Sequence, residues 1–333
     1  MQNGLFNVTE EQQSLVELIR DFMTKEIKPH VLEWEKEGHY PQEIIEQGIE
    51  MGLHMLQVPE EYGGMGLDTT TTAMMIEEGA KVESTFMGMF NVTSMGGKIV
   101  MAAGNEEQKQ YYSGLLQKGY LSSFCLTEPD AGSDSAAVRT TAVRKGDSYV
   151  INGTKMFITN ASLASVFLVV ATLDPSKGSK GLATFIVEKD RPGVTVGKKI
   201  EKIGMRLSNT AEVIFDNVEI PAFNLIGTEE GGFANAMKVL TASRPIIAAS
   251  SLGACQLARD LAIQYSKERI AFGKPICAKQ MIQEKIANME MLIQAGRGLV
   301  YNATMLLDQG KPCNKEASIA KMLCNGSIRQ DHR

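Results

Sequence analysis

The spacing of apolar residues divides the chain into three segments of different secondary structure. From Thr9 to about Tyr120, apolar residues recur every three or four positions, which is typical of amphipathic helices. From Ser122 to about Pro221 the period becomes two, which predicts β-strands. From Gly232 onward the helical period returns in longer runs, which predicts a bundle. This order of helices, strands and helices excludes an alternating βαβ fold.

The first segment is predicted to form a helical domain, which we place at residues 1–121. Thr9 and Gln12 have the spacing of a capping box, and the helix that they start should end at Pro29. The other helices expected here lie at 44–53, 71–80 and 93–102 and directly after 105–109.

The second segment is predicted to form an antiparallel β domain, similar to a small barrel, which we place at residues 122–230. Its short strands are separated by turn signals, and tight connections favour antiparallel neighbours. The turns are expected at 146–147, 152–153 and 178–181. The strands are expected at 140–145, 148–152, 154–159, 166–172, 182–188 and 211–215.

The third segment is predicted to form a C-terminal helical bundle, which we place at residues 231–333. A helix at 233–240 leads through Arg244 and Pro245 into a long helix at 246–266. Further helices are expected at 280–308 and from Asn314 onward. The predicted fold class is therefore α+β, mainly α.

Composition and charge narrow the possible partners. The 333 residues suggest two or three domains, and the balance of 34 Lys+Arg against 39 Asp+Glu disfavours nucleic acid or anionic membranes as partners. No apolar run approaches the ~18 residues of a membrane span, and the N-terminus lacks the features of a signal peptide. The 5 cysteines never form a CxxC pair, and the 4 histidines lack metal-ligand spacing. We expect a cytoplasmic protein with reduced thiols, without a metal, nucleic-acid or membrane partner.

The densest group of special residues lies at 124–134. Its Glu-Pro-Asp-Ala-Gly stretch can be an ordinary turn, in which Pro fixes φ and Gly permits positive φ. Alternatively, it can be an exposed loop whose hydroxyls at Thr127 and Ser133 bind a planar heterocycle. Spacing alone favours the turn. No GxGxxG follows a strand and opens a helix, so a Rossmann dinucleotide site has no support.

Six motifs in the same order resemble those of the acyl-CoA dehydrogenase family, and together they cover nearly the whole chain. They lie at 124–134, 152–160, 204–212, 241–245, 268–274 with Gln280, and 317–321. The resemblance implies an N-terminal helical domain, a middle β domain and a C-terminal four-helix bundle. This order agrees with the apolar periods.

The resemblance implies that the chain is a flavoprotein with FAD as its cofactor. The residues that it assigns to the flavin site are Phe124, Leu126, Thr127, Ser133, Phe157 and Thr159. The first four match the loop that contacts the flavin ring and the bound thioester. The last two match an aromatic wall and a hydrogen bond behind the ring. Without the neighbouring motif, Phe157 would be taken for a core residue of an apolar strand.

A second group of residues matches positions that reach the FAD of a neighbouring subunit. These are Arg269, Phe272 and Gln280, and an arginine suits a pyrophosphate because its planar fork makes charge-assisted hydrogen bonds. Taken alone, 267–269 would be a solvated helix face. The resemblance implies a homo-oligomer, in this family usually a tetramer.

A third group matches the segment that contacts acyl-CoA. It contains Thr241, Ser243 and Arg244, and Ser133 of the flavin loop is also expected to contact the substrate. Without the resemblance, Arg244 would be a charge at the start of a helix that begins at Arg-Pro.

The resemblance also implies the reaction. The family converts a saturated acyl-CoA to the trans-2-enoyl-CoA: a carboxylate removes the α proton, the β hydrogen leaves as hydride to the flavin, and electrons pass to electron-transfer flavoprotein. Here we expect a short- or medium-chain acyl-CoA and a role in fatty acid metabolism. Alternative enzymes on the same scaffold are an acyl-CoA oxidase and a flavin monooxygenase.

The catalytic base is not identified. The family's usual glutamate follows the helix at 317–321, but residues 322–333 do not resemble that continuation. The other known position corresponds to Ser243, which cannot act as the base, and Glu128 and Asp331 are weaker candidates. We therefore expect an incomplete C-terminal bundle. The alternative function is a non-catalytic or inactive, shortened family member that binds flavin or acyl-CoA only.

Overall fold

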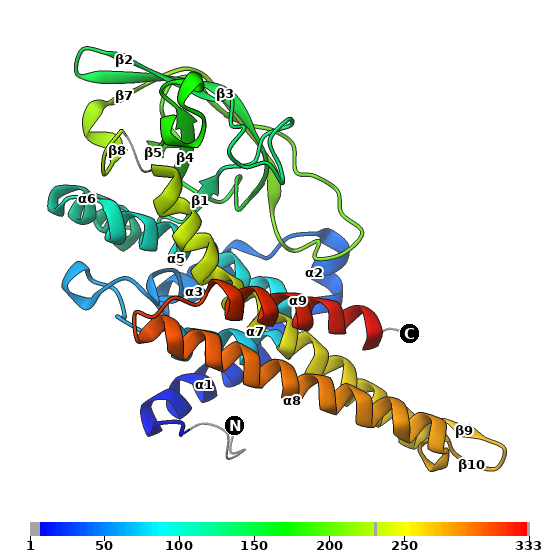
Figure 1. Cartoon of the computed structure of the whole chain (residues 1–333). Helices are drawn as coiled ribbons and strands as arrows, with labels where there is room; N and C mark the ends of the chain where they lie inside the picture. The colour runs from blue at the N-terminus through cyan, green and yellow to red at the C-terminus, as the bar shows by residue number, and fades with distance from the viewer. Residues whose placement is uncertain (1–6, 230–231, 332–333) are drawn as a thin grey trace. The chain divides into compact units, whose positions relative to one another are not determined.

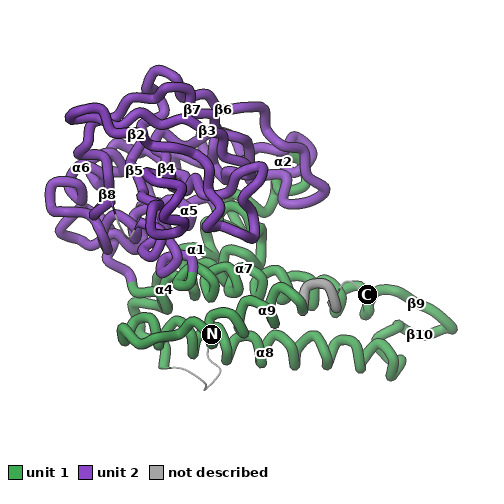
Figure 2. The backbone as a smooth tube through the Cα atoms, turned by 45° about the horizontal axis from the view of Figure 1, so that its top comes forward, with its two compact units in different colours: residues 1–33, 68–88, 241–333 green, residues 34–67, 89–240 purple. Residues whose placement is uncertain are grey.

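The structure is a computed structural model that describes the backbone of residues 7–229 and 232–331 and the side chains as far as Gly326. It consists of two compact units, each assembled from separate stretches of sequence (Figure 2). Unit 1 comprises Met1–Glu33, Asp68–Gly88 and Thr241–Arg333. Unit 2 comprises Trp34–Leu67 and Met89–Leu240. The three-domain boundaries predicted above stay a prediction.

In the part of unit 1 that the structure describes, the regular elements are helices and one small hairpin (Figure 1). Its helices are α1 (Glu10–Phe22), α4 (Thr69–Ala80), α8 (Gln280–Asp308), α9 (Asn314–Asp331) and the part of α7 (Gly232–Glu268) that begins at Thr241. Its hairpin is formed by β9 (Ile270–Ala271) and β10 (Lys274–Pro275). Helices α8 and α9 lie side by side, as the long helical periods predicted.

The predicted capping box at the start of α1 is confirmed. The Thr9 hydroxyl accepts a hydrogen bond from the Gln12 N–H at 3.1 Å, and the Gln12 side chain accepts one from the Thr9 N–H at 3.1 Å. The α-helix ends earlier than Pro29, however, because a π-helix, Met23–Ile27, follows it. Wide π turns of this kind interrupt α-helices in short segments.

The expected break at Arg244 and Pro245 was wrong, because α7 runs through both residues. Proline removes one backbone donor and strains a helix, but the burial of apolar residues that follow it offsets this cost. Ile246 and Leu252 are both buried in unit 1. By length and composition α7 could cross a membrane, yet 44% of its apolar window is buried, and core helices of globular proteins pass the same test.

Unit 2 combines helices with a mixed sheet. The helices wholly or mainly in its sequence are α2 (Val31–Glu37), α3 (Gln42–Glu50), α5 (Ser84–Ala103) and α6 (Glu106–Gln117). The strands are β1 (Ser122–Cys125), β2 (Thr141–Lys145), β3 (Ser148–Thr159), β4 (Val166–Thr172), β5 (Leu182–Glu188), β6 (Val194–Val196), β7 (Thr210–Pro221) and β8 (Leu225–Ile226).

The strand order is β6-β7-β3-β2-β4-β5-β8, with β1 also paired to β4. Most neighbours are antiparallel, as expected, but β1 and β2 each pair with β4 in parallel. Strand β4 is buried along its whole length, which explains its continuous apolar sequence.

The turn expected at Asn152 and Gly153 was wrong, because β3 continues through it with a bulge against β7. Gly153 has a φ of +154°, and a Cβ there would lie 2.4 Å from the Thr140 hydroxyl. A glycine inside a strand often marks such a close approach. The dipeptide therefore has the sequence of a hairpin turn, but the pairing of β3 with β7 keeps it within a strand.

Candidate functional site

The loop at 124–134, here called the flavin loop, is fixed to strand β3 by consecutive hydrogen bonds. The Met156 N–H donates to the Thr127 carbonyl at 2.8 Å, and Lys155 Nζ donates to the Leu126 carbonyl at 3.1 Å. A tight turn follows, in which Glu128 and Ala131 exchange backbone hydrogen bonds of 3.0 and 3.2 Å. The two motifs, separate in sequence, thus form one structural element.

Lys155 and Glu128 form a buried ion pair beneath this loop. The Lys155 side chain is 0% exposed, and its Nζ lies 2.7 Å from Glu128 Oε1. Glu128 also accepts hydrogen bonds from the Arg139 N–H at 2.7 Å and the Thr140 N–H at 2.9 Å, and from the Thr140 hydroxyl at 2.5 Å. Every oxygen of this carboxylate is therefore hydrogen-bonded by protein groups.

These contacts favour a structural role for Glu128 over that of a catalytic base. Burial by itself would raise the pKa of Glu128, but Lys155 and the hydrogen bonds from Thr140 and Arg139 hold that pKa below its usual value. Burial lowers the pKa of Lys155, and Glu128 opposes this shift. A carboxylate held ionised by four donors is a poor proton acceptor.

The residue two positions after Lys155 is strained and exposed. Phe157 has a φ of +57° and is 61% exposed. The register between β3 and β7 shifts between Lys155 and Ile158, so Phe157 lies in a bulge. The alternative that Phe157 is a core residue was wrong. Strained backbone of this kind in a bulky residue clusters at functional sites.

The other predicted residues of the flavin loop differ in burial. Leu126 is buried and packs in a small core cluster, with Phe124 against it. Thr127 is half-buried and bonded through its carbonyl to the residue before Phe157, whereas Ser133 is exposed. The exposed Phe157 ring, on a strand that is hydrogen-bonded to this loop, fits a planar heterocycle such as the flavin ring.

Cys125 lies in the same element, directly before Leu126. Its thiol is fully buried, and burial raises its pKa to about 12 although the nearby Lys155 charge acts in the opposite direction. A thiol of this kind is protonated and unreactive in the folded chain.

The second predicted group lies on the hairpin of unit 1. Phe272 and Gly273 connect its strands with φ of +54° and +73°, which is the backbone of a primed hairpin turn. Phe272 is 95% exposed, and Lys279 Nζ lies 4.4 Å from its ring centroid. Arg269 and Gln280 are also exposed. A bulky aromatic residue at positive φ is strained, and strained residues cluster at ligand-binding and other functional sites.

The third predicted group lies on α7. Because α7 begins at Gly232, Arg244 is not at a helix start, and this alternative was wrong. Arg244 Nη1 donates to the Ser318 hydroxyl of α9 at 3.1 Å. Ser243 is buried and Thr241 is half-buried. The weaker base candidate Asp331 has its side chain outside the described residues.

A cavity of about 520 Å³ opens in unit 1, but it contains none of the predicted residues. Its lining includes Asp308, whose carboxylate accepts the Thr69 N–H at 2.7 Å and the Thr70 N–H at 3.0 Å. Asp308 therefore caps α4. Within the described residues, no group of His, Cys, Asp and Glu is arranged to hold a metal.

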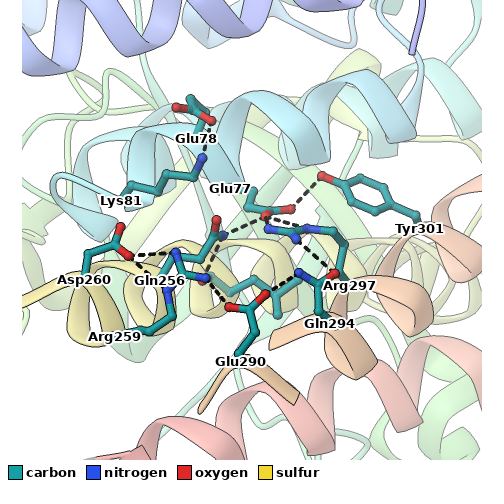
Figure 3. Close-up of polar contacts among 11 residues, drawn as sticks. Glu77, Glu78, Lys81, Gln256, Arg259, Asp260, Glu290, Gln294, Arg297 and Tyr301 are labelled. Atoms are coloured by element: carbon teal, nitrogen blue, oxygen red, sulfur yellow. Dashed lines mark hydrogen bonds and ion pairs between the residues drawn. The ribbon is translucent and has the colours of Figure 1, made fainter. Parts of the chain in front are cut away.

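Unit 1 contains a buried polar cluster that the sequence did not reveal, centred on Glu77 of α4 (Figure 3). Glu77 is 0% exposed, and its Oε1 accepts from Arg297 Nη2 at 2.6 Å and Gln256 Nε2 at 2.7 Å. Its Oε2 accepts from the Tyr301 hydroxyl at 2.6 Å. Arg297 and Tyr301 are four residues apart on one face of α8, a spacing that could have indicated a shared partner.

The chain matches three successive family models over almost its entire length. The N-terminal domain of acyl-CoA dehydrogenase matches residues 9–119, the middle domain 123–218, and the C-terminal domain 230–330.

Known proteins resemble the chain in sequence and in structure. An acyl-CoA dehydrogenase of Bacillus subtilis (strain 168) is 42% identical over 321 residues, which are 96% of this chain and 85% of that protein. Butyryl-CoA dehydrogenase from Megasphaera elsdenii superposes with a TM-score of 0.94 at 37% identity and covers 98% of this chain and 87% of its own. A chain from a study of the electron transferring flavoprotein of Acidaminococcus fermentans and flavin-based electron bifurcation superposes with a TM-score of 0.95 at 39% identity. The match covers 98% of this chain and 86% of that chain.

Proposed function

The chain belongs to the acyl-CoA dehydrogenase family of FAD-dependent enzymes, and from this premise we propose that it converts a short- or medium-chain acyl-CoA to the trans-2-enoyl-CoA. The single observation that carries the proposal is the exposed, strained Phe157 beside the hydrogen-bonded flavin loop. The resemblance to butyryl-CoA dehydrogenase supports the short acyl chain.

We assign the flavin ring to the face formed by the flavin loop and the end of β3. The residues of this face are Phe124, Leu126, Thr127, Ser133, Phe157 and Thr159. Phe157 supplies a flat apolar wall, and the hydroxyls of Thr127 and Thr159 orient the ring by hydrogen bonds. When bound at this face, FAD would supply the redox chemistry of the reaction as a two-electron acceptor.

We assign Arg269, Phe272 and Gln280 to the FAD of a second copy of the chain. Their exposure and the strained turn at Phe272 support this assignment, because a planar guanidinium and an aromatic ring at a hairpin tip suit a dinucleotide phosphate and its ring. The active form proposed here is a homo-oligomer, a tetramer as in the family.

We assign Thr241, Ser243 and Arg244, with Ser133, to the acyl-CoA. The Arg244 guanidinium carries the positive charge of this segment and suits an anionic or carbonyl group of the ligand. No described carboxylate is assigned as the base.

The proposed electron acceptor is electron-transfer flavoprotein, which the resemblance to the Acidaminococcus chain supports. The proposed compartment is the cytoplasm, and the proposed domains are 1–121, 122–230 and 231–333.

An anaerobic titration tests the proposal. The purified chain is reconstituted with FAD and titrated with butyryl-CoA while the absorbance of oxidised flavin is followed. Loss of that absorbance at stoichiometric substrate, with crotonyl-CoA as product, is the expected result. Retained flavin that does not bleach with any short- or medium-chain acyl-CoA would instead support a binder without dehydrogenase activity.

A further inference from the structure

We propose that Lys155 is a positioning residue for the cofactor: with Glu128 it fixes the backbone around Thr127, so that the flavin loop is shaped for FAD before FAD binds. This inference rests on the proposed flavin site and adds residues that contact the loop rather than the ring.

The contacts hold three consecutive loop residues from one side. Lys155 Nζ binds the Leu126 carbonyl at 3.1 Å and the Glu128 carboxylate at 2.7 Å, while the N–H of Met156 binds the Thr127 carbonyl at 2.8 Å. The backbone carbonyls of Leu126 and Thr127 and the side chain of Glu128 are thereby bound to β3. The Thr127 side chain keeps its hydroxyl available for a ligand.

The same short stretch of β3 also presents the ring wall. Lys155 is fully buried, whereas Phe157, two residues later, is 61% exposed in the bulge. One strand therefore binds the loop through Lys155 and exposes an aromatic ring at Phe157. A displacement of Lys155 should alter both the loop and the orientation of this ring.

Stability alone is a weak reason for this ion pair. Apolar residues of similar volume commonly replace buried ion pairs without loss of stability, because desolvation of two charges offsets their attraction. An apolar side chain at Lys155 could fill the volume but could not donate to the Leu126 carbonyl. The feature that only the lysine provides is the hydrogen bond to the Leu126 carbonyl.

Two variants of the full-length chain separate these roles. Lys155→Met leaves Glu128 buried and without its counter-charge, so it should reduce both stability and FAD binding. The double variant Lys155→Met/Glu128→Gln removes both charges and should recover much of the lost stability. It still lacks the donor to the Leu126 carbonyl, so we expect its Kd for FAD to be raised at least tenfold and its bound-flavin absorption band to be changed in shape.

A matched control uses a second buried carboxylate, Glu77 of unit 1. Arg297→Met/Glu77→Gln also removes a buried ion pair, but from unit 1, where the Glu77 contacts bind helices to each other. Its Kd for FAD should stay within twofold of the wild type, and its flavin spectrum should be unchanged. Fluorescence quenching of added FAD, visible absorption and urea unfolding give the three readouts.

The outcomes distinguish this inference from the function on which it rests. If the wild-type chain binds FAD and Lys155→Met/Glu128→Gln binds it equally well with the same spectrum, the positioning role is wrong and the proposed function stands. An equal rise of the Kd for FAD in the control Arg297→Met/Glu77→Gln would also overturn the positioning role of Lys155. If the wild-type chain binds no FAD, the proposed function fails, and this inference fails with it.

Discussion

Two buried carboxylates, Glu77 in unit 1 and Glu128 in unit 2, are held by different kinds of partner. The donors to Glu77 are side chains from α7 and α8, namely Gln256, Arg297 and Tyr301. The donors to Glu128 include backbone N–H groups as well as side chains, and its counter-charge, Lys155, also binds a loop carbonyl.

The difference is that the Glu77 contacts stabilise the packing of helices, whereas the Glu128 contacts stabilise the conformation of a loop. Side chains that bind one another across helices keep the helices together but leave the backbone conformation to the helices themselves. Side chains that bind loop backbone decide which conformation the loop adopts, because a loop has no internal ladder of hydrogen bonds. Loss of the Glu77 cluster should therefore reduce stability, whereas loss of the Glu128 cluster should also change a ligand site.

The largest effect should follow Arg297→Met, which leaves Glu77 buried without its counter-charge. Removal of one partner of a buried pair typically costs about 3–5 kcal/mol. Urea unfolding of the full chain measures this loss of unfolding free energy. Arg259→Met is the control, because Arg259 pairs with the partly exposed Asp260 and Glu290 and should cost at most about 1 kcal/mol. Equal losses in the two variants would contradict the special role of Glu77.

A smaller effect, about 1.5–3 kcal/mol, should follow Tyr301→Phe, which removes one charge-assisted donor to Glu77. Burial, with the nearby Glu77 carboxylate, raises the pKa of Tyr301 well above its usual value of 10.0. The stabilising contribution of Tyr301 is therefore complete below pH 10 and is lost as the pH rises toward the folded-state pKa. Unfolding measured from pH 8 to pH 11 should show the gap between wild type and variant narrowing. A constant gap would mean that Tyr301 does not couple to Glu77.

In unit 2, the Glu128 carboxylate should make the free energy of unfolding depend on pH under acidic conditions. Because the pKa of Glu128 is lowered when folded, its contribution is complete above its usual value of 4.5 and is lost as the pH falls toward the folded-state pKa. One such group changes stability by at most about 1.4 kcal/mol per pH unit. Between pH 5 and pH 3, Lys155→Met/Glu128→Gln should lose less stability than the wild type. An identical acid dependence would contradict an ionised Glu128.

The smallest effect on stability, a gain of up to about 1 kcal/mol, is expected for Phe157→Gly. Glycine adopts positive φ without strain, although its greater freedom in the unfolded chain offsets part of the gain. The same variant should weaken FAD binding because the ring wall is lost. Asn217→Gly, at a φ of 50° on the exposed part of β7, should change stability by a few tenths of a kcal/mol without an effect on FAD. A destabilised Phe157→Gly chain would show that the turn is not strained.

Local periodicity predicted most helices and longer strands correctly because burial on one face of an element leaves a repeating pattern. The capping box at Thr9 was predictable because both of its hydrogen bonds join residues only three positions apart. The short strands β6 and β8 were not predicted, because two or three residues carry no period. The continuous α7 was missed because long-range burial outweighs the local effect of Pro245.

The residues proposed for the flavin site were indicated by motifs, but the buried residues that bind them were not. Lys155 lies within a motif and looks like an ordinary surface residue of a strand, yet its partner Glu128 is 27 positions earlier. Glu77 and Arg297 are 220 positions apart. Such pairings arise from topology and carry no local signal. The exposure of Phe157 likewise depends on the bulge between β3 and β7.

The burial of Cys125 gives the chain an intrinsic reporter of loop opening. A thiol that is fully buried, with its pKa raised to about 12, is alkylated only when its surroundings open. Its rate of modification therefore measures how often the element that contains the flavin loop exposes its interior, provided that peptide mapping separates Cys125 from the partly exposed Cys277 and from the other buried thiols, Cys255, Cys313 and Cys324. A ligand that binds the closed loop should slow this reaction in proportion to its occupancy, so cofactor binding can be followed by mass spectrometry without any absorbing or fluorescent label.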